Sequence, residues 1–129
     1  MHEPRRFHSI SLLHDGDVLV AGGEFKEDTS ASAELYNPET RTWTLTEPMN
    51  FGRYTHSASV LFDGTVLVAG GFLDGQCLAS AEVYNPKLRS WSVVENMTEP
   101  RCDHTASVLP NGTVLITGGE TRRCVRGSF

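Results

Sequence analysis

The chain has 129 residues, a formal net charge of −5 and a pI near 5.4. This acidic balance argues against a nucleic-acid-binding surface, which would carry a basic stripe. The sequence shows no apolar run near the ~18 residues of a membrane span, and no apolar signal-peptide core follows Met1. Nucleic-acid and membrane partners are therefore not expected.

The sequence repeats every 48 residues without a shift in register. Residues 5–49 align with residues 53–97 without a gap, and 24 of the 45 aligned positions are identical. A third and shorter copy starts at residue 101. A period of roughly 40 to 50 residues built from strand-like segments is typical of a β-propeller blade. A ring normally has ~4 to 8 blades, so the chain is expected to be part of a larger propeller or to complete a ring with other chains.

The first two strands of each copy are predicted to form a hairpin. In the second copy, residues 56–61 and 66–69 are β-rich and flank the dipeptide Asp63-Gly64. Asp-Gly between such runs is a strong signal for a tight hairpin turn. The run 66–69 is apolar at every position, which predicts a strand covered on both faces by neighbouring blades.

Two further strands complete each predicted blade. After a variable loop at residues 72–80, the segment 81–86 forms a third strand that Asn85-Pro86 ends in a turn. Residues 90–94 alternate as a fourth strand, and its Trp91 is large enough to seal the contact with a neighbouring blade. Four antiparallel strands per copy therefore make one blade.

This pattern resembles the kelch repeat, in which a strand closes on a Gly-Gly pair and a spaced Tyr and Trp follow. The residues that carry the resemblance are Gly22, Gly23, Tyr36, Trp43, Gly70, Gly71, Tyr84, Trp91, Gly118 and Gly119. The expected fold is all-β: a kelch-type β-propeller segment. It has two four-stranded antiparallel blades, residues 5–49 and 53–97, plus the inner hairpin of a third at 101–119. Residues 120–129 form a tail outside the repeat.

The resemblance implies a function in protein binding, because similar families form six- or seven-bladed rings that bind proteins through loops on one face. The candidate partner-binding residues on that face are Arg53, Tyr54, Phe72, Leu73, Arg101 and Asp103. A structural role competes with this for the arginines, which recur in every copy and could pair with Glu34 or Glu82. The non-repeated Tyr54 and Asp103, with the loops 24–29 and 72–78, are therefore the better candidates.

An enzymatic function is the alternative, because the blades also resemble those of galactose oxidase, a copper radical enzyme. That family needs copper ligands and a Tyr-Cys crosslink; Cys102 lies near the start of an inner strand, but Tyr54 comes one blade too early. We therefore expect a non-enzymatic module without a cofactor. The alternative is a fragment of a secreted galactose-oxidase-like or carbohydrate-binding kelch protein.

A metal site formed by the three repeated histidines, His8, His56 and His104, is not expected. Equivalent positions on adjacent blades lie too far apart for zinc, which needs its ligands at about 2.0 to 2.1 Å. Each histidine is more simply explained by a hydrogen bond to the backbone or to a neighbouring turn.

The cysteines and the blade ends give two further expectations. Cys77, Cys102 and Cys124 are odd in number and do not recur at the repeat period, so the sequence predicts no disulfide framework and slightly favours a reducing, cytoplasmic location. A secreted location would apply if a signal sequence lies upstream. The open faces of the first and third copies should expose apolar side chains and strand edges, which favours self-association.

Overall fold

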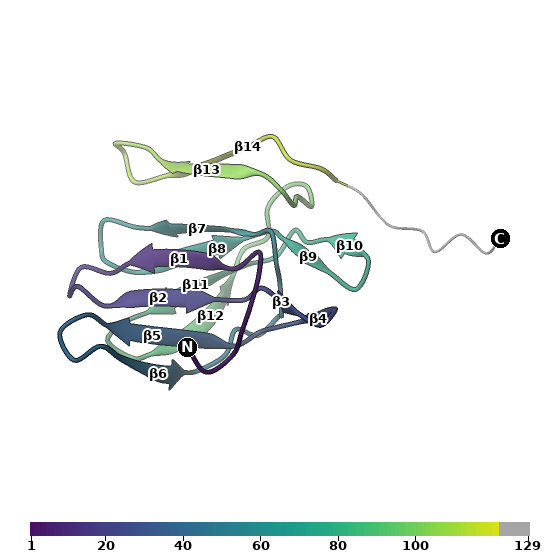
Figure 1. The fold of residues 1–129 in the computed structure, drawn as a ribbon. Coiled ribbons are helices and arrows are strands. Elements are labelled where there is room, and N and C mark those ends of the chain that lie inside the picture. The colour runs from purple at the N-terminus through teal and green to yellow at the C-terminus, as the bar shows by residue number, and fades with distance from the viewer. Residues whose placement is uncertain (122–129) are drawn as a thin grey trace.

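The computed structural model describes residues 1–121, and this part of the chain consists of β-strands and connecting loops (Figure 1). Blade 1 has the strand order β1 (Ser9–Leu12), β2 (Val18–Ala21), β5 (Ala33–Asn37) and β6 (Thr42–Thr46). Blade 2 repeats this order with β7 (Ser57–Val60), β8 (Val66–Ala69), β11 (Ala81–Asn85) and β12 (Ser90–Val94). Blade 3 is the hairpin β13 (Thr105–Val108) and β14 (Val114–Thr117). The predicted all-β class with two four-stranded antiparallel sheets is confirmed.

The turns follow the chemistry that the sequence predicts. In each first hairpin, the side chain of Asp15, Asp63 or Asn111 accepts a hydrogen bond from the backbone amide two residues later, at 3.0 to 3.1 Å. The following glycine has a positive φ, which is 86° at Gly64. These turns fix the register in which Val60 pairs with Val66.

The predicted variable loop at 72–80 contains an additional short hairpin. It is formed by β9 (Phe72–Leu73) and β10 (Gln76–Cys77), and blade 1 has the equivalent pair β3 (Glu24–Phe25) and β4 (Asp28–Thr29). The turn between β9 and β10 is Asp74-Gly75, and both residues have positive φ. Asp-Gly is the preferred dipeptide for such a two-residue turn, so this hairpin had a signal in the sequence.

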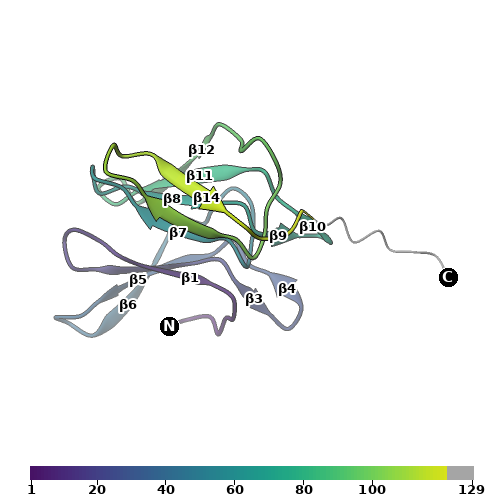
Figure 2. The ribbon, with the colours of Figure 1, turned by 90° about the horizontal axis from the view of Figure 1, so that it is seen from above.

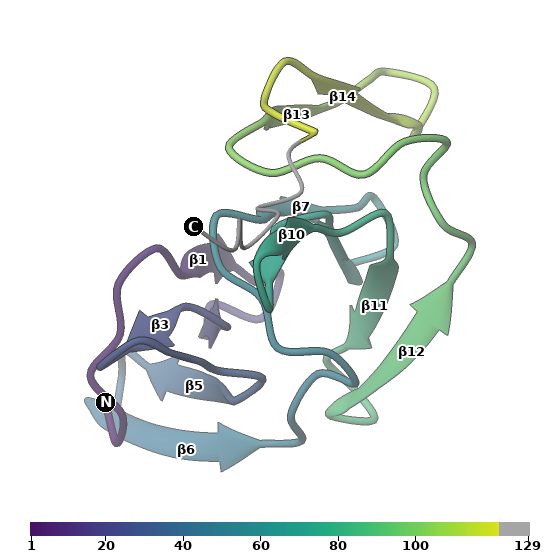
Figure 3. The ribbon, with the colours of Figure 1, turned by 90° about the vertical axis from the view of Figure 1, so that its right-hand side faces the viewer.

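The blades lie side by side around the inner strands. β7 contacts both β1 and β13, whereas β6 and β12 form the outer edges of their blades (Figure 3). The hairpin β13–β14 lies over blade 2 in the view from above (Figure 2). The main core fills the interface between blades 1 and 2, with Leu19, Leu35, Val66 and Val68 among its buried members.

The predicted sealing role of tryptophan applies at the interface that is present. Tyr84 and Trp91 of blade 2 are 0% and 8% exposed, and the Trp91 indole donates a hydrogen bond to the Glu47 carbonyl of blade 1 at 2.9 Å. Tyr36 and Trp43, their equivalents in blade 1, are only half-buried. Burial of this pair therefore depends on a blade packing in front of it.

The Gly-Gly pairs allow the next blade to approach closely. A side chain at Gly22 would place its Cβ 2.5 Å from the Arg53 carbonyl oxygen and 2.7 Å from the His56 ring. The Gly23 amide donates to the same Arg53 carbonyl at 2.8 Å. The backbone is also left-handed at Gly22, with φ of 67°.

A buried ion pair joins the lead-in to the third strand of each complete blade. We use "lead-in" for the four residues ahead of the first strand, at 5–8, 53–56 and 101–104. Arg5 lies 2.9 Å from Glu34, and Arg53 lies 3.0 Å from Glu82. None of these four side chains is more than 1% exposed. Both pairs therefore belong to the scaffold.

The described residues contain no helix of the length and hydropathy needed to cross a membrane.

Candidate functional site

The candidate binding face lies where the lead-ins meet the hairpins β3–β4 and β9–β10; we call it the upper face. Tyr54 in the second lead-in pairs with Phe72 through an antiparallel bridge, with N···O distances of 3.3 and 2.8 Å. The structure therefore brings together two of the residues selected from the sequence, from positions 18 apart. Leu73, the next residue of β9, is half-buried.

The same backbone bridge recurs in each copy with different side chains. Blade 1 has Arg6 paired with Glu24, and these two side chains also form a salt bridge. In blade 3, Cys102 pairs with Glu120, which the sequence-based boundaries placed outside the repeat. The bridge thus carries an ion pair in blade 1 and an aromatic pair in blade 2. Side-chain chemistry at the upper face consequently differs from blade to blade on one backbone geometry.

Three aromatic rings extend across two blades on this face. The centroids of Tyr54 and Phe72 are 5.4 Å apart, and those of Phe7 and Tyr54 are 6.2 Å apart. The Phe7 residue is 55% exposed, and the guanidinium of Arg6 lies 5.4 Å from its ring centroid. We call Phe7, Tyr54 and Phe72 the aromatic cluster. Phe7 was not selected from the sequence, because nothing there indicated that the first lead-in reaches the second.

Asp103 belongs to a row of main-chain hydrogen bonds that joins the three lead-ins. The Thr55 amide donates to the Phe7 carbonyl at 3.0 Å, and the Asp103 amide donates to the Thr55 carbonyl at 3.1 Å. These three residues hold equivalent positions and all have left-handed φ, between 52° and 57°. Asp103 is exposed, and its backbone is bonded to Thr55, the residue after Tyr54 of the aromatic cluster.

The structure corrects the assignment of Arg53 as a partner-binding residue. Arg53 has no exposed surface, and its guanidinium donates to the Gly70 and Ser80 carbonyls and to Glu82 at 2.7 to 3.0 Å. Burial lowers the pKa of Arg53, and the Glu82 carboxylate partly opposes this. The competing structural role is therefore the one observed for this arginine.

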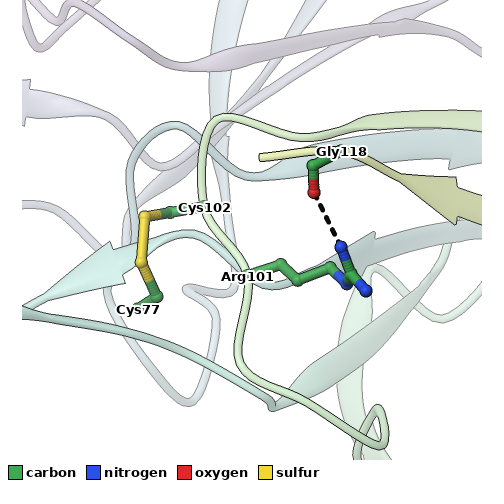
Figure 4. The surroundings of a disulfide bond; sticks show 4 residues. All are labelled: Cys77, Arg101, Cys102 and Gly118. Carbon is green, nitrogen blue, oxygen red and sulfur yellow. Dashed lines mark hydrogen bonds between the residues drawn. A yellow bond between two sulfur atoms is a disulfide. The ribbon is translucent and has the colours of Figure 1, made fainter. Parts of the chain in front are cut away.

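Arg101 differs from Arg53. Its side chain is 32% exposed, donates to the Gly118 carbonyl at 2.8 Å and lies 3.8 Å from Glu99 (Figure 4). Arg101 thus keeps one backbone contact of its counterparts while remaining open to solvent. It stays a candidate for contact with a partner.

The structure also corrects the prediction that the cysteines do not pair. Cys77 of β10 and Cys102 of the third lead-in form a disulfide, with their Cα atoms 5.3 Å apart (Figure 4). The two positions lie in a non-repeated loop and a lead-in, so periodicity could not reveal them. The bond clamps the upper-face hairpin of blade 2 to blade 3, and it removes the cysteine-based argument for a reducing compartment. Cys124 lies outside the described residues.

His56 and His104 each bind a serine hydroxyl on the first strand of the preceding blade, a contact that was not expected from the sequence. Backbone contacts with Arg5 and Ala69 act on His8 and His104, as expected. His56 Nε2 lies 2.8 Å from Ser9 Oγ, and His104 Nε2 lies 2.8 Å from Ser57 Oγ. Burial, followed by repulsion from Arg53, lowers the pKa of His56 to about 3. Burial also lowers the pKa of His8 and of His104. Within the described residues, no group of three or more histidine, cysteine or acidic side chains could hold a metal.

A cavity lies between the turns at the opposite end of blades 1 and 2. It has a volume of about 540 Å³ and is lined by His14, Asp15, Asp63, Lys87 and neighbouring residues. Asp15 and Asp63 are occupied in turn hydrogen bonds. None of the residues selected from the sequence for partner binding lines this cavity.

Comparison with known families agrees with this architecture. The family model of the Kelch motif matches residues 5–50 and again residues 53–98, which together make up more than two thirds of the chain. The chain belongs to the kelch-repeat family. No curated protein sequence gives a significant match to it.

Proposed function

We propose that this kelch-repeat chain is a non-enzymatic protein-binding module whose partner contacts the aromatic cluster on the upper face. The observation that carries the proposal is the bridge position itself. Blade 1 has an ion pair there, whereas blade 2 has Tyr54 and Phe72, joined by the exposed Phe7 of blade 1. Aromatic anchors of this kind supply most of the energy at many protein interfaces.

The surroundings of the cluster fit such an interface. Leu73 follows Phe72 in β9 and is half-buried. The third lead-in adds charges of both signs: the amide of the exposed Asp103 donates to Thr55, and the carbonyl of the partly exposed Arg101 accepts from Gly71. A polar rim around an aromatic centre excludes water from the central contacts. The Phe7 carbonyl accepts a hydrogen bond from Thr55 of blade 2, and Tyr54 exchanges two main-chain hydrogen bonds with Phe72 of its own blade. The backbone beneath the rings is therefore already ordered, which lowers the entropy lost when a partner binds.

The Cys77–Cys102 bond supports the non-enzymatic part of the proposal. In the alternative based on galactose oxidase, Cys102 was the cysteine considered for a Tyr-Cys crosslink. Its sulfur is bonded to Cys77 instead. Nothing else in the described part of the upper face continues that resemblance.

The test compares partner capture by two paired variants of the tagged chain. Y54S/F72S changes the aromatic cluster, and F62S/L88S changes two exposed apolar residues, 67% and 73% exposed, at turns away from it. Crosslinking in extract followed by mass spectrometry identifies the captured proteins. We expect Y54S/F72S to lower capture about tenfold or more, as loss of an interface anchor does, and F62S/L88S to retain it. Equal capture by both variants would refute the proposed face.

A further inference from the structure

The two ends of the described blade stack are complementary surfaces. In every blade, side chains of the first strand alternate between the two faces of the sheet. We call the face toward the preceding blade the head face and the face toward the following blade the tail face. Blade 2 packs both faces against neighbours. Within residues 1–121, the first strand of blade 1 has no neighbouring blade on its head face, and blade 3 has none on its tail face.

Burial follows this alternation through the repeat. Leu19 of blade 1 is 1% exposed on its tail face, whereas the equivalent Leu115 of blade 3 is 49% exposed. On the head face, Ala58 and Val60 of blade 2 are half-buried, whereas their equivalents Ile10 and Leu12 of blade 1 are 64% and 66% exposed. The exposure in blade 1 is confined to its first strand, since Val20 of the second strand is 2% exposed. The open faces therefore carry the residue types that bury one another inside the stack.

The polar contacts between blades follow the same rule. Ser9 and Ser57 each receive a histidine ring from the next blade, and each hydroxyl also lies 3.4 Å from a carbonyl of its own second strand. Thr105 makes the equivalent contact with the Thr117 carbonyl at 3.4 Å, but no described histidine reaches it. His8, the first histidine of the repeat, lies on the open head face of blade 1. The position of His8 matches that of the two histidines that bind serine.

The glycine at the end of the second strand gives an independent indication. Cβ atoms built at Gly22 and Gly70 would meet the lead-in carbonyl, the histidine ring and a methionine methyl of the following blade. A Cβ at Gly118 would meet nothing within 4 Å. The equivalent contact groups, Met1, Arg5 and His8, all lie at the start of this chain, 48 residues before Met49, Arg53 and His56.

We infer that the tail face of blade 3 binds the head face of blade 1 in a second copy of this chain. In this contact His8 of one copy bonds to Thr105 of the other, and the lead-in of one copy covers Gly118 of the other. Leu115 packs against Ile10 and Leu12. The interface is heterologous, since different patches meet, so it joins copies head to tail and forms a ring where the rotation closes. It uses other surfaces than the upper face and does not rest on the proposed function.

The heterologous geometry allows a complementation test. L12R blocks the head face and L115R blocks the tail face; each variant keeps the other face intact. The charge-matched control is L88R, because Leu88 is 73% exposed in the turn between β11 and β12. Molar mass is measured by light scattering between 5 and 200 µM, with circular dichroism to confirm the β fold of each variant.

We expect the unmodified chain and L88R to associate as concentration rises, and L12R and L115R each to remain monomeric alone. An equimolar mixture of L12R and L115R should form a 1:1 heterodimer, because the intact tail face of L12R can bind the intact head face of L115R. The two remaining faces are blocked, so association stops there. Three results would overturn the inference: an unmodified chain that stays monomeric, a single variant that still associates alone, or a mixture that stays monomeric. Irregular aggregation that neither variant reduces would overturn it as well.

A second variant tests the glycine contact without adding charge. G118A adds a methyl group where no atom lies within 4 Å in one copy. In the inferred contact the same methyl would meet the Arg5 carbonyl and His8 ring of the neighbouring copy, as it would at Gly22. We expect G118A to weaken association at least tenfold in concentration. Unchanged association would show that Gly118 remains uncovered, and it would overturn the inferred contact.

Discussion

His56 Nε2 lies 2.8 Å from Ser9 Oγ, so one hydrogen bond joins the lead-in of blade 2 to the first strand of blade 1. The other ring nitrogen, Nδ1, is buried without a hydrogen-bond partner. A protonated ring would carry an N–H donor and a charge into this site, close to Arg53. The packing of blade 2 against blade 1 therefore favours the neutral form of His56.

The first prediction concerns pH. The pKa of His56 is about 3 in the folded chain against 6.5 for a free histidine, so the unfolded chain binds more protons between these values. Stability is retained above pH 6.5 and falls as the pH drops below it, by about 2 kcal/mol at pH 5 from this residue alone. Urea unfolding at pH 7.5, 6.5, 5.5 and 5.0 measures the slope. His56→Gln should flatten it, whereas Ser9→Ala, which removes no titrating group, should keep it.

The second prediction concerns the buried ion pair. Arg53→Met should lower the free energy of unfolding by about 3 to 5 kcal/mol, because it leaves the buried Glu82 carboxylate without its cation. Arg101→Met should cost much less, since the Arg101 side chain is 32% exposed. Urea midpoints of the two variants give the comparison. A similar loss in both would show that burial of the pair is not what matters.

The third prediction separates steric contact from backbone strain at the glycines. Gly70 and Gly118 both have positive φ, at 65° and 73°, so alanine is strained at either position. Only at Gly70 would the added methyl also meet the next blade, through the Arg101 carbonyl and the His104 ring. Thermal melts of dilute samples should show Gly70→Ala about 1 to 3 kcal/mol less stable than Gly118→Ala. Equal losses would mean that the blades can shift apart without cost.

The fourth prediction concerns the disulfide. Closing the 25-residue separation between Cys77 and Cys102 is expected to stabilise the fold by about 3.5 kcal/mol in the chain-entropy model. Cys77→Ser or a reducing agent should lower the melting temperature, and Cys124→Ser should not. Peptide mapping without reduction identifies the bonded pair. Recovery of a Cys77–Cys124 peptide would contradict the pairing observed here.

The recurrent features of the fold could be predicted because they are properties of one blade. Asp63-Gly64 set the first hairpin, Trp91 marked the fourth strand, and exact register made both unmistakable. The pairing of Arg53 with Glu82 was foreseen as the structural alternative to a binding role, and burial of both side chains decides in its favour.

Contacts between different blades of the chain were harder to predict, because a single sequence does not say which blade surfaces meet. The partner of His56 is a serine 47 residues earlier, and Phe7 reaches the cluster across a blade boundary. Cys77 and Cys102 occupy positions that carry other residue types in the other copies of the repeat, so the period gave no sign of their proximity. The proposed binding residues likewise differ in side chain from one copy of the repeat to the next, which is why they were recognised only in part.

The bridge recurs as Arg6–Glu24, Tyr54–Phe72 and Cys102–Glu120. The upper face therefore has three equivalent backbone positions that carry different side-chain pairs. The main-chain hydrogen bonds hold each pair in place whatever side chains it carries. Selection can thus replace one pair by another without rebuilding the sheet beneath it. Evolution or design can therefore change the binding specificity of this surface by substituting the two residues of one bridge.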